Sequence, residues 1–186
     1  MGRIATEKLV KLPNLSFSYE PPDRTVPALQ RRDVGIRDDA FVYWCCQTNY
    51  KYLPQYDWVF PAIAQQVPQA QFLFIQIQPE SEASQLFRDR LKNAFAAKKL
   101  NVSDFVTYLP ALDPEPFSAI AALCDIALDS FEWSGCNSSL ETLAQGTPIV
   151  TCPGKFMRSR HTAAILTAIE CPETITKSPQ EFVVSA

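Results

Sequence analysis

A group of small and polar residues stands just before a predicted helix in the stretch DSFEWSGCNSSLETLAQGTPIVTCPG, residues 129–154: Gly135, Asn137, Ser138 and Ser139. Gly135 permits a positive φ or a close approach of the backbone, and Asn137 or Ser138 can cap the helix. The backbone N–H groups of a first helical turn, together with the positive end of the helix dipole, favour an anion. The pattern is therefore typical of a phosphate site, but a plain helix cap has the same spacing.

Two charged residues could complete a nucleotide site around such an anion. Lys51 follows an apolar run and can supply a positive charge, although a lone lysine is more often solvated. Glu141 comes about one turn into the helix, where an acidic side chain can accept hydrogen bonds from ribose hydroxyls. The chain has neither the Gly-x-Gly-x-x-Gly fingerprint nor a Gly-Lys-Ser/Thr P-loop, which argues against a dehydrogenase and a P-loop ATPase.

The remaining reactive residues are open to two interpretations each. Arg158 and Arg160 could face a phosphate or lie on a solvated helix face, and His161 could be a structural hydrogen-bonding residue or a catalyst. The 6 cysteines show no Cys-x-x-Cys spacing, so we expect reduced thiols rather than disulfides or a zinc site. Because His161 is the single histidine of the sequence, a multi-histidine metal site is excluded, and we predict a site without a metal.

Composition limits the class of protein. The chain has 186 residues, of which 47% are hydrophobic and 20% charged, as expected for one globular domain or one lobe of a larger protein. The formal net charge of -3 argues against a general nucleic-acid-binding protein, which would be basic. No apolar run is long enough to cross a bilayer, and the first residues lack the apolar core of a secretory signal. We therefore predict a cytoplasmic protein that binds neither nucleic acid nor a membrane.

Apolar runs and helical patterns alternate along the chain after residue 39. Strands are predicted at 40–46, 71–77, 104–109, 125–130 and 147–152, with a short one at 173–176, and helices at 56–67, 81–100, 116–124, 138–145 and 158–169. Within the helix at 81–100, Leu86, Leu91, Phe95 and Leu100 recur at helical intervals. This alternation predicts an α/β fold with a doubly wound, mostly parallel, Rossmann-like sheet.

In such a sheet, ligands bind beyond the carboxyl ends of the strands. The candidate residues are those that follow each strand: Gln47, Thr48, Asn49, Tyr50 and Lys51 after the first, residues 110–113 with Leu112 after the third, the opening stretch 129–154 after the fourth, and Pro153, Gly154 and Lys155 after the fifth.

The two ends of the chain differ from the middle. Residues 1–39 are rich in proline and polar turn formers and are predicted to be an irregular connector from a preceding lobe, whereas residues 40–186 form the predicted domain. The segment SPQE, residues 178–181, is a capping box with proline at the first helical position. Few residues follow it, so we expect the domain to be truncated at its C-terminus and the chain to be a fragment.

Two long blocks resemble one known family. CCQTNYKYLPQYDWVFPAIA (residues 45–64) and LDSFEWSGCNSSLETLAQGTPIVTCPGKFMRSRHTAAIL (residues 128–166) are similar to the C-terminal catalytic lobe of the bacterial SPINDLY-like and O-GlcNAc transferases, glycosyltransferase family 41. The segment KLVKLPNLSFSYEPP (residues 8–22) looks like the entrance to this lobe. The resemblance implies a GT-B fold, in which two Rossmann-like lobes face each other, usually behind tetratricopeptide helices.

The resemblance also implies roles for individual residues. Lys51 matches the lysine that contacts the donor diphosphate and assists its departure, with Gln47 and Thr48 in the polar turn beside it. Glu141 matches the acidic residue that contacts the ribose. Asn137, Ser138 and Ser139 match the small polar residues that hold the diphosphate, and Gly135 and Cys136 just before them are also expected to bind the donor. Two departures stand out: Cys136 replaces a histidine of the animal enzymes, and the loop PALDPEP, which contains Leu112, lacks their base-reading lysine.

The implied activity is the metal-independent transfer of a sugar from a nucleotide diphosphate-sugar to a Ser or Thr hydroxyl of a protein. UDP-GlcNAc is the expected donor, with a GDP-sugar as the alternative because the plant SPINDLY-type relatives use one. The acceptor protein would be held by the repeats or the N-terminal lobe, so this fragment alone is expected to be inactive. The alternatives are a degenerate, non-catalytic module that binds a nucleotide or a protein, and, with less support, a sugar-nucleotide epimerase.

Overall fold

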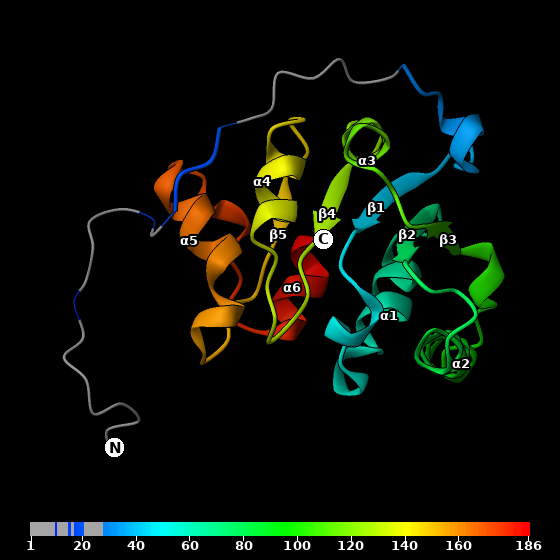
Figure 1. Ribbon diagram of the computed structural model, residues 1–186. Coiled ribbons are helices and arrows are strands. Elements are labelled where there is room, and N and C mark those ends of the chain that lie inside the picture. The colour runs from blue at the N-terminus through cyan, green and yellow to red at the C-terminus, as the bar shows by residue number, and fades with distance from the viewer. Residues whose placement is uncertain (1–9, 11–14, 16, 21–27) are drawn as a thin grey trace.

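The computed structural model describes Val10, Leu15, residues 17–20 and residues 28–186. In this part of the chain, parallel strands form one 5-stranded sheet in the order β3-β2-β1-β4-β5. Their bounds are β1 (Phe41–Cys45), β2 (Ala70–Gln76), β3 (Val106–Pro110), β4 (Ile126–Leu128) and β5 (Ile149–Val150). The strand order reverses between β1 and β4, which pair through Tyr43 and Ile126 (Figure 1). The prediction of a doubly wound parallel α/β fold is confirmed.

Helices cover both faces of this sheet. They are α1 (Val59–Gln66), α2 (Glu82–Ala97), α3 (Pro114–Ala121), α4 (Asn137–Leu143), α5 (His161–Ala168) and α6 (Pro179–Ser185). Side chains from α1, α2 and α6 bury an aromatic-rich core against one face, and those from α3 and α4 pack on the other. Burial on both faces explains why β1 and β2 are nearly continuous apolar runs rather than alternating ones. No helix of the described residues is long and apolar enough to span a membrane.

Two predicted details were wrong. The buried stripe of α2 consists of Phe87, Leu91 and Phe95, whereas Leu86 is 59% exposed. A shift of one residue turns a helical side chain by about 100°, so the apolar Leu86 lies away from the sheet. The predicted strand at 173–176 is a 3-10 turn (Pro172–Thr174) followed by one isolated parallel bridge from Thr151 to Ile175.

Segments before and at the end of the predicted domain pack against the sheet. Within the predicted connector, the 3-10 turn Arg31–Val34 is held by Arg31, which donates to the carbonyl of Ala40 at 2.8 Å and pairs with Asp125 at 3.2 Å. The rest of that connector lies largely outside the described residues, so the domain boundary stays a prediction. At the other end, the hydroxyl of Ser178 accepts the predicted capping bond from the N–H of Glu181, and Phe182 is buried.

Candidate functional site

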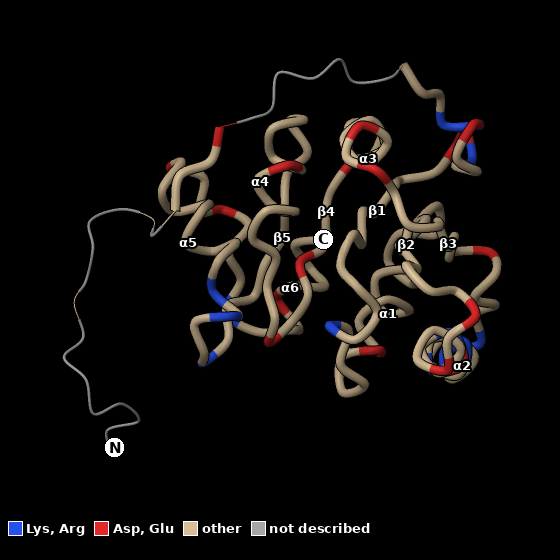
Figure 2. Tube along the Cα trace, viewed as in Figure 1, with Lys and Arg blue, Asp and Glu red and all other residues tan. Residues whose placement is uncertain are grey.

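The predicted site residues meet beyond the carboxyl ends of β1 and β4, where the strand order reverses. Lys51 ends the 3-10 turn Asn49–Lys51, Gln47 follows β1, and Ser138 lies in the first turn of α4. The Nζ of Lys51 donates to Oε1 of Gln47 at 2.7 Å, and Nε2 of Gln47 donates to Oγ of Ser138 at 2.6 Å. Positive charges lie along this edge beside the loops after β1 and β5 (Figure 2). The structure therefore joins three residues that were predicted separately.

The direction of these hydrogen bonds leaves donors free for an anion. A lysine ammonium has three donors and no acceptor, so the Gln47 amide must turn its oxygen toward Lys51 and its nitrogen toward Ser138. The Ser138 oxygen then accepts, and its own proton can be donated elsewhere. Gln47 is 5% exposed, and its backbone N–H donates to the hydroxyl of buried Tyr52 at 3.1 Å. We call the three hydrogen-bonded residues Lys51, Gln47 and Ser138 the seat. The bond from Gln47 to buried Tyr52 fixes the seat to the core.

Gly135 is required by close packing rather than by a positive φ. A Cβ at this position would clash with Oγ of Ser139 and would lie 2.9 Å from Nε2 of Gln47 and 3.0 Å from Oγ of Ser138. Its N–H donates to Oδ1 of Asp129 at 2.8 Å, so this N–H is not available to a ligand. Gly135 therefore makes room for the seat and does not itself bind through its N–H.

Asp129, at the end of β4, organises the turn that carries Gly135. Its carboxylate accepts from the N–H of Ser130 at 3.0 Å and of Gly135 at 2.8 Å, and from the hydroxyls of Ser134 at 2.8 Å and Thr151 at 2.7 Å. Burial raises the pKa of Asp129, and these hydrogen bonds act in the opposite direction. The sequence analysis included Asp129 in a range of candidate residues but gave it no role, although an acid at the end of a buried strand was a signal for one.

The other residues of the predicted α4 site are divided between the interior and the surface. The Ser139 hydroxyl is buried and lies 2.8 Å from the hydroxyl of Thr162 in α5, so its side chain joins helices. Asn137 is exposed, and Cys136 is the N-cap residue without a side-chain cap bond. Burial raises the pKa of Cys136, and the positive charge of Lys51 acts in the opposite direction. Glu141 follows one turn later and is partly exposed.

Thr48 and Leu112 are the remaining predicted site residues. Thr48 begins the 3-10 turn of Lys51, and its buried Oγ1 has no hydrogen-bond partner in the described structure. Leu112, in the loop between β3 and α3, is partly buried and packs on the core of that face. Both donor-binding assignments stay predictions.

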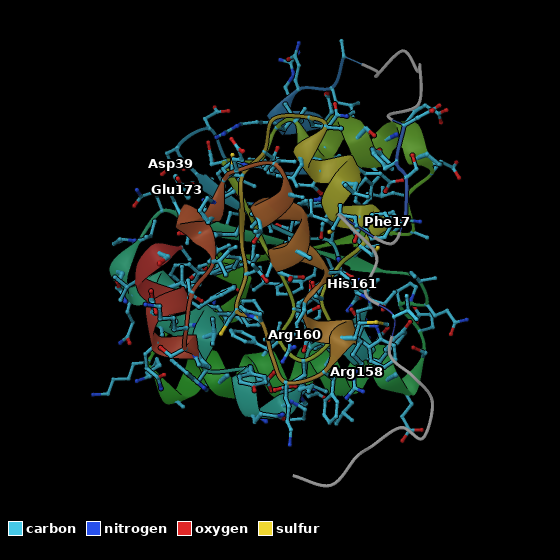
Figure 3. All side chains as sticks on the ribbon, turned by 90° about the vertical axis from the view of Figure 1, so that its left-hand side faces the viewer. Phe17, Asp39, Arg158, Arg160, His161 and Glu173 are labelled. Carbon is cyan, nitrogen blue, oxygen red and sulfur yellow. The ribbon has the colours of Figure 1, made fainter. Side chains whose placement is uncertain are left out.

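Arg158, Arg160 and His161 lie near one another at one end of α5 (Figure 3). Arg158 donates through Nε to the carbonyl of Glu132 at 3.2 Å, and Arg160 donates through Nε to the carbonyl of Gly154 at 2.8 Å.

The cysteines of the chain are free, as predicted. Among the described residues, no group of three or more His, Cys, Asp or Glu side chains could hold a metal ion.

Comparisons with known proteins identify the family of this chain. The family model described as glycosyl transferase family 41 matches residues 10–186. A UDP-N-acetylglucosamine–peptide N-acetylglucosaminyltransferase of Giardia intestinalis is 26% identical over 151 residues, which are 81% of this chain and 10% of that protein. A relative from Arabidopsis thaliana, named as a probable UDP-N-acetylglucosamine–peptide N-acetylglucosaminyltransferase SEC, is 24% identical over 165 residues, 86% of this chain and 16% of that protein. The chain thus spans a small part of these relatives.

Solved structures agree on the fold. A mutant of the Thermobaculum terrenum O-GlcNAc transferase superimposes with a TM-score of 0.74 at 22% identity, covering 89% of this chain and 30% of that one. A UDP-GlcNAc 2-epimerase from Neisseria meningitidis superimposes with a TM-score of 0.57 at 13% identity, covering 83% of this chain and 37% of that one. The fold is that of a GT-B glycosyltransferase lobe. Because the family model matches residues 10–186 of a chain of 186 residues, the chain belongs to glycosyltransferase family 41.

Proposed function

We propose that this chain is the donor-binding part of a metal-independent protein O-glycosyltransferase, with a nucleotide diphosphate-sugar as donor and a Ser or Thr hydroxyl as acceptor. The observation that carries the proposal is the seat: Lys51, Gln47 and Ser138 joined by bonds of 2.7 and 2.6 Å at the point where the strand order reverses. This is the place where doubly wound sheets bind nucleotides.

The chemistry follows from the charge that develops during transfer. When the bond from the sugar to the diphosphate breaks, negative charge grows on the leaving phosphate oxygens. The ammonium of Lys51 keeps two donors beyond its bond to Gln47, and the Ser138 hydroxyl keeps its proton, so both can stabilise that charge without reorganising. In this scheme Lys51 is the catalytic residue. Its positive charge neutralises the diphosphate, as a divalent cation does in metal-dependent transferases.

UDP-GlcNAc is the donor that we propose, because both curated relatives carry UDP-N-acetylglucosamine in their names. The ribose would lie toward Glu141 and the base toward the loop of Leu112. That loop, residues 110–113, contains no basic side chain, so a GDP-sugar remains the alternative donor. The acceptor protein would be positioned by parts of the protein beyond this lobe, and the fragment alone would bind the donor without transferring it.

Calorimetric titration of the chain with UDP, UDP-GlcNAc, GDP and GDP-fucose, each with and without magnesium, tests the proposal. We expect one nucleotide diphosphate to bind selectively and with the same affinity in both conditions. Binding of none of the four, or binding that requires magnesium, would contradict a metal-independent donor site. Selective binding without transfer in the full-length protein would instead support the non-catalytic module, which the departures at Cys136 and the Leu112 loop favour.

A further inference from the structure

A second surface lies at the same edge of the sheet, on the loops that follow β4 and β5. We call it the rim and define it by five side chains: Trp133, Phe156, Met157, Arg158 and Arg160. Three of them are large apolar residues with exposed fractions of 48% for Trp133, 46% for Phe156 and 78% for Met157. Exposed apolar residues are ordinary one at a time, but a cluster of them marks an interaction surface.

Arg158 is held rigidly within the rim. Its guanidinium carbon lies 4.7 Å from the ring centre of Phe156 and 5.5 Å from that of Trp133, which are cation–π distances. Its Nε donates to the carbonyl of Glu132, and its own carbonyl accepts from the N–H of Ser134 at 2.8 Å. The two terminal nitrogens of the guanidinium take part in no hydrogen bond recorded among the described residues.

Arg160 is also anchored through its Nε. Its Nε donates to the carbonyl of Gly154 at 2.8 Å, which again leaves the terminal nitrogens toward solvent. The described part of the chain contains arginines used differently: Arg90 forms bonds of 2.8 and 2.6 Å to the carboxylate of Asp57. By contrast, neither Arg158 nor Arg160 is in an ion pair with a described carboxylate. Two oriented, unneutralised guanidinium groups suit the carboxylates or phosphates of a ligand.

The rim is continuous with the seat. The ring of Tyr50, the residue before Lys51, meets the ring of Trp133 edge to face at 6.5 Å between centres. Contacts therefore run without interruption from the loop of Lys51 through Tyr50 and Trp133 to Arg158. A ligand lying on the rim would reach the place where the donor is proposed to bind.

We propose that the rim is a docking track for an acidic segment of the acceptor polypeptide that also carries apolar side chains. This inference rests on the proposed function only where it calls the polypeptide an acceptor. The binding of an acidic peptide to the rim does not depend on it. The ligand is a polypeptide rather than a small anion because Phe156 and Met157 offer apolar contacts that phosphate cannot use. Its acidic character follows from charge complementarity, since Lys155 adds a third exposed cation beside the two arginines.

The test measures fluorescence anisotropy of a fluorescein-labelled peptide in which Glu alternates with Phe and Val around a central Ser. We expect the double substitution Arg158→Gln and Arg160→Gln to weaken its binding at least tenfold. The matched control, Lys92→Gln in α2 with Lys98→Gln at the C-cap of that helix, removes two exposed positive charges and should leave binding unchanged. The charge reversal Arg158→Glu with Arg160→Glu should instead favour a peptide with Lys in place of Glu.

Titration with UDP separates the inference from the proposed function. We expect the Gln double variant to bind UDP as well as the wild type does, since neither arginine contacts the seat. Unchanged peptide affinity in the Gln variant, a loss of UDP affinity in it, or displacement of the peptide by equimolar pyrophosphate would each overturn the docking track. Absence of UDP binding by the wild type would contradict the donor site alone, because anisotropy reads the rim independently.

Discussion

The turn between β4 and α4 and the loop between β5 and α5 lie side by side, joined by the bond from Ser134 to Arg158, but they hold their polar groups in opposite ways. In the first, Asp129 is buried and accepts hydrogen bonds from four groups. In the second, the guanidinium groups of Arg158 and Arg160 are exposed and anchored through one nitrogen each. The first arrangement fixes atoms in place, and the second presents charge to a partner.

The comparison suggests that the two loops separate two tasks. A transition state needs donors held within fractions of an ångström, which a buried and fully hydrogen-bonded network can provide. A polypeptide partner needs charge and apolar surface that it can reach, which the exposed side chains of the rim provide. Substitutions in the buried network of Asp129 and Gly135 should therefore affect stability and nucleotide binding together. Substitutions of the rim side chains should affect neither.

The largest effect is expected for Asp129→Ala. The N–H groups of Ser130 and Gly135 would be left buried without an acceptor, and each such group costs roughly 1–3 kcal/mol. We expect a loss of about 3 kcal/mol or more in the free energy of unfolding, measured by urea denaturation, and no measurable UDP binding. Asp129→Asn, which keeps an oxygen for these N–H groups, should be less destabilised. Equal losses in the two variants would contradict this account of the turn.

A smaller effect is expected for Gly135→Ala. The added methyl group would displace Ser139 and Gln47, so we expect about 1–3 kcal/mol of destabilisation and at least a tenfold loss of UDP affinity. Gly154→Ala in the neighbouring loop is the matched control, because its methyl group would lie 2.6 Å from the Ser159 hydroxyl and 2.9 Å from Oε2 of Glu132. It should cost similar stability and leave UDP affinity unchanged. Loss of UDP affinity in both would show that the loops are not separate.

The smallest effect concerns pH. Because burial raises the pKa of Asp129 above its ordinary value of 3.8, the folded state binds this proton more tightly than the unfolded state does. This group therefore stabilises the fold less as the pH rises from 3.8 through its folded-state pKa. As the pH falls from 7 to 4, the free energy of unfolding of the wild type should therefore increase relative to that of Asp129→Asn. A constant difference between the two urea midpoints would contradict the raised pKa.

The sheet could be predicted because its information is local. The strands are apolar runs, and the turns between them carry proline and glycine, so strand and helix positions followed from the residues themselves. The helix predicted at 138–145, for example, is observed as α4 (Asn137–Leu143), and Gly146 follows it with a φ of +82°. The error at Leu86 has the same origin: Leu86 and Phe87 are both apolar, and the period alone does not decide which of two neighbours lies on the buried side.

The site was harder to predict because its contacts are long-range. Lys51 and the start of α4 were named, but the bond from Gln47 to Ser138 joins residues 91 positions apart, and no spacing rule gives it. The role of Asp129 depends on Thr151 and Gly135, which come from two later segments. Similarly, the anchoring of Arg158 needs Trp133, so a sequence that suggests a solvated arginine gives an oriented one in the fold.

The most direct test of the central claim is the affinity for UDP of Lys51→Met beside that of Lys92→Met, an exposed lysine of α2, measured by calorimetry in low-salt buffer without metal. Loss of a charge-assisted bond to the diphosphate should weaken binding by Lys51→Met at least tenfold, or about 1.4 kcal/mol. The same substitution at Lys92 should change nothing, and both variants should unfold at the wild-type temperature. Wild-type affinity in Lys51→Met would contradict the seat as the site of the donor diphosphate.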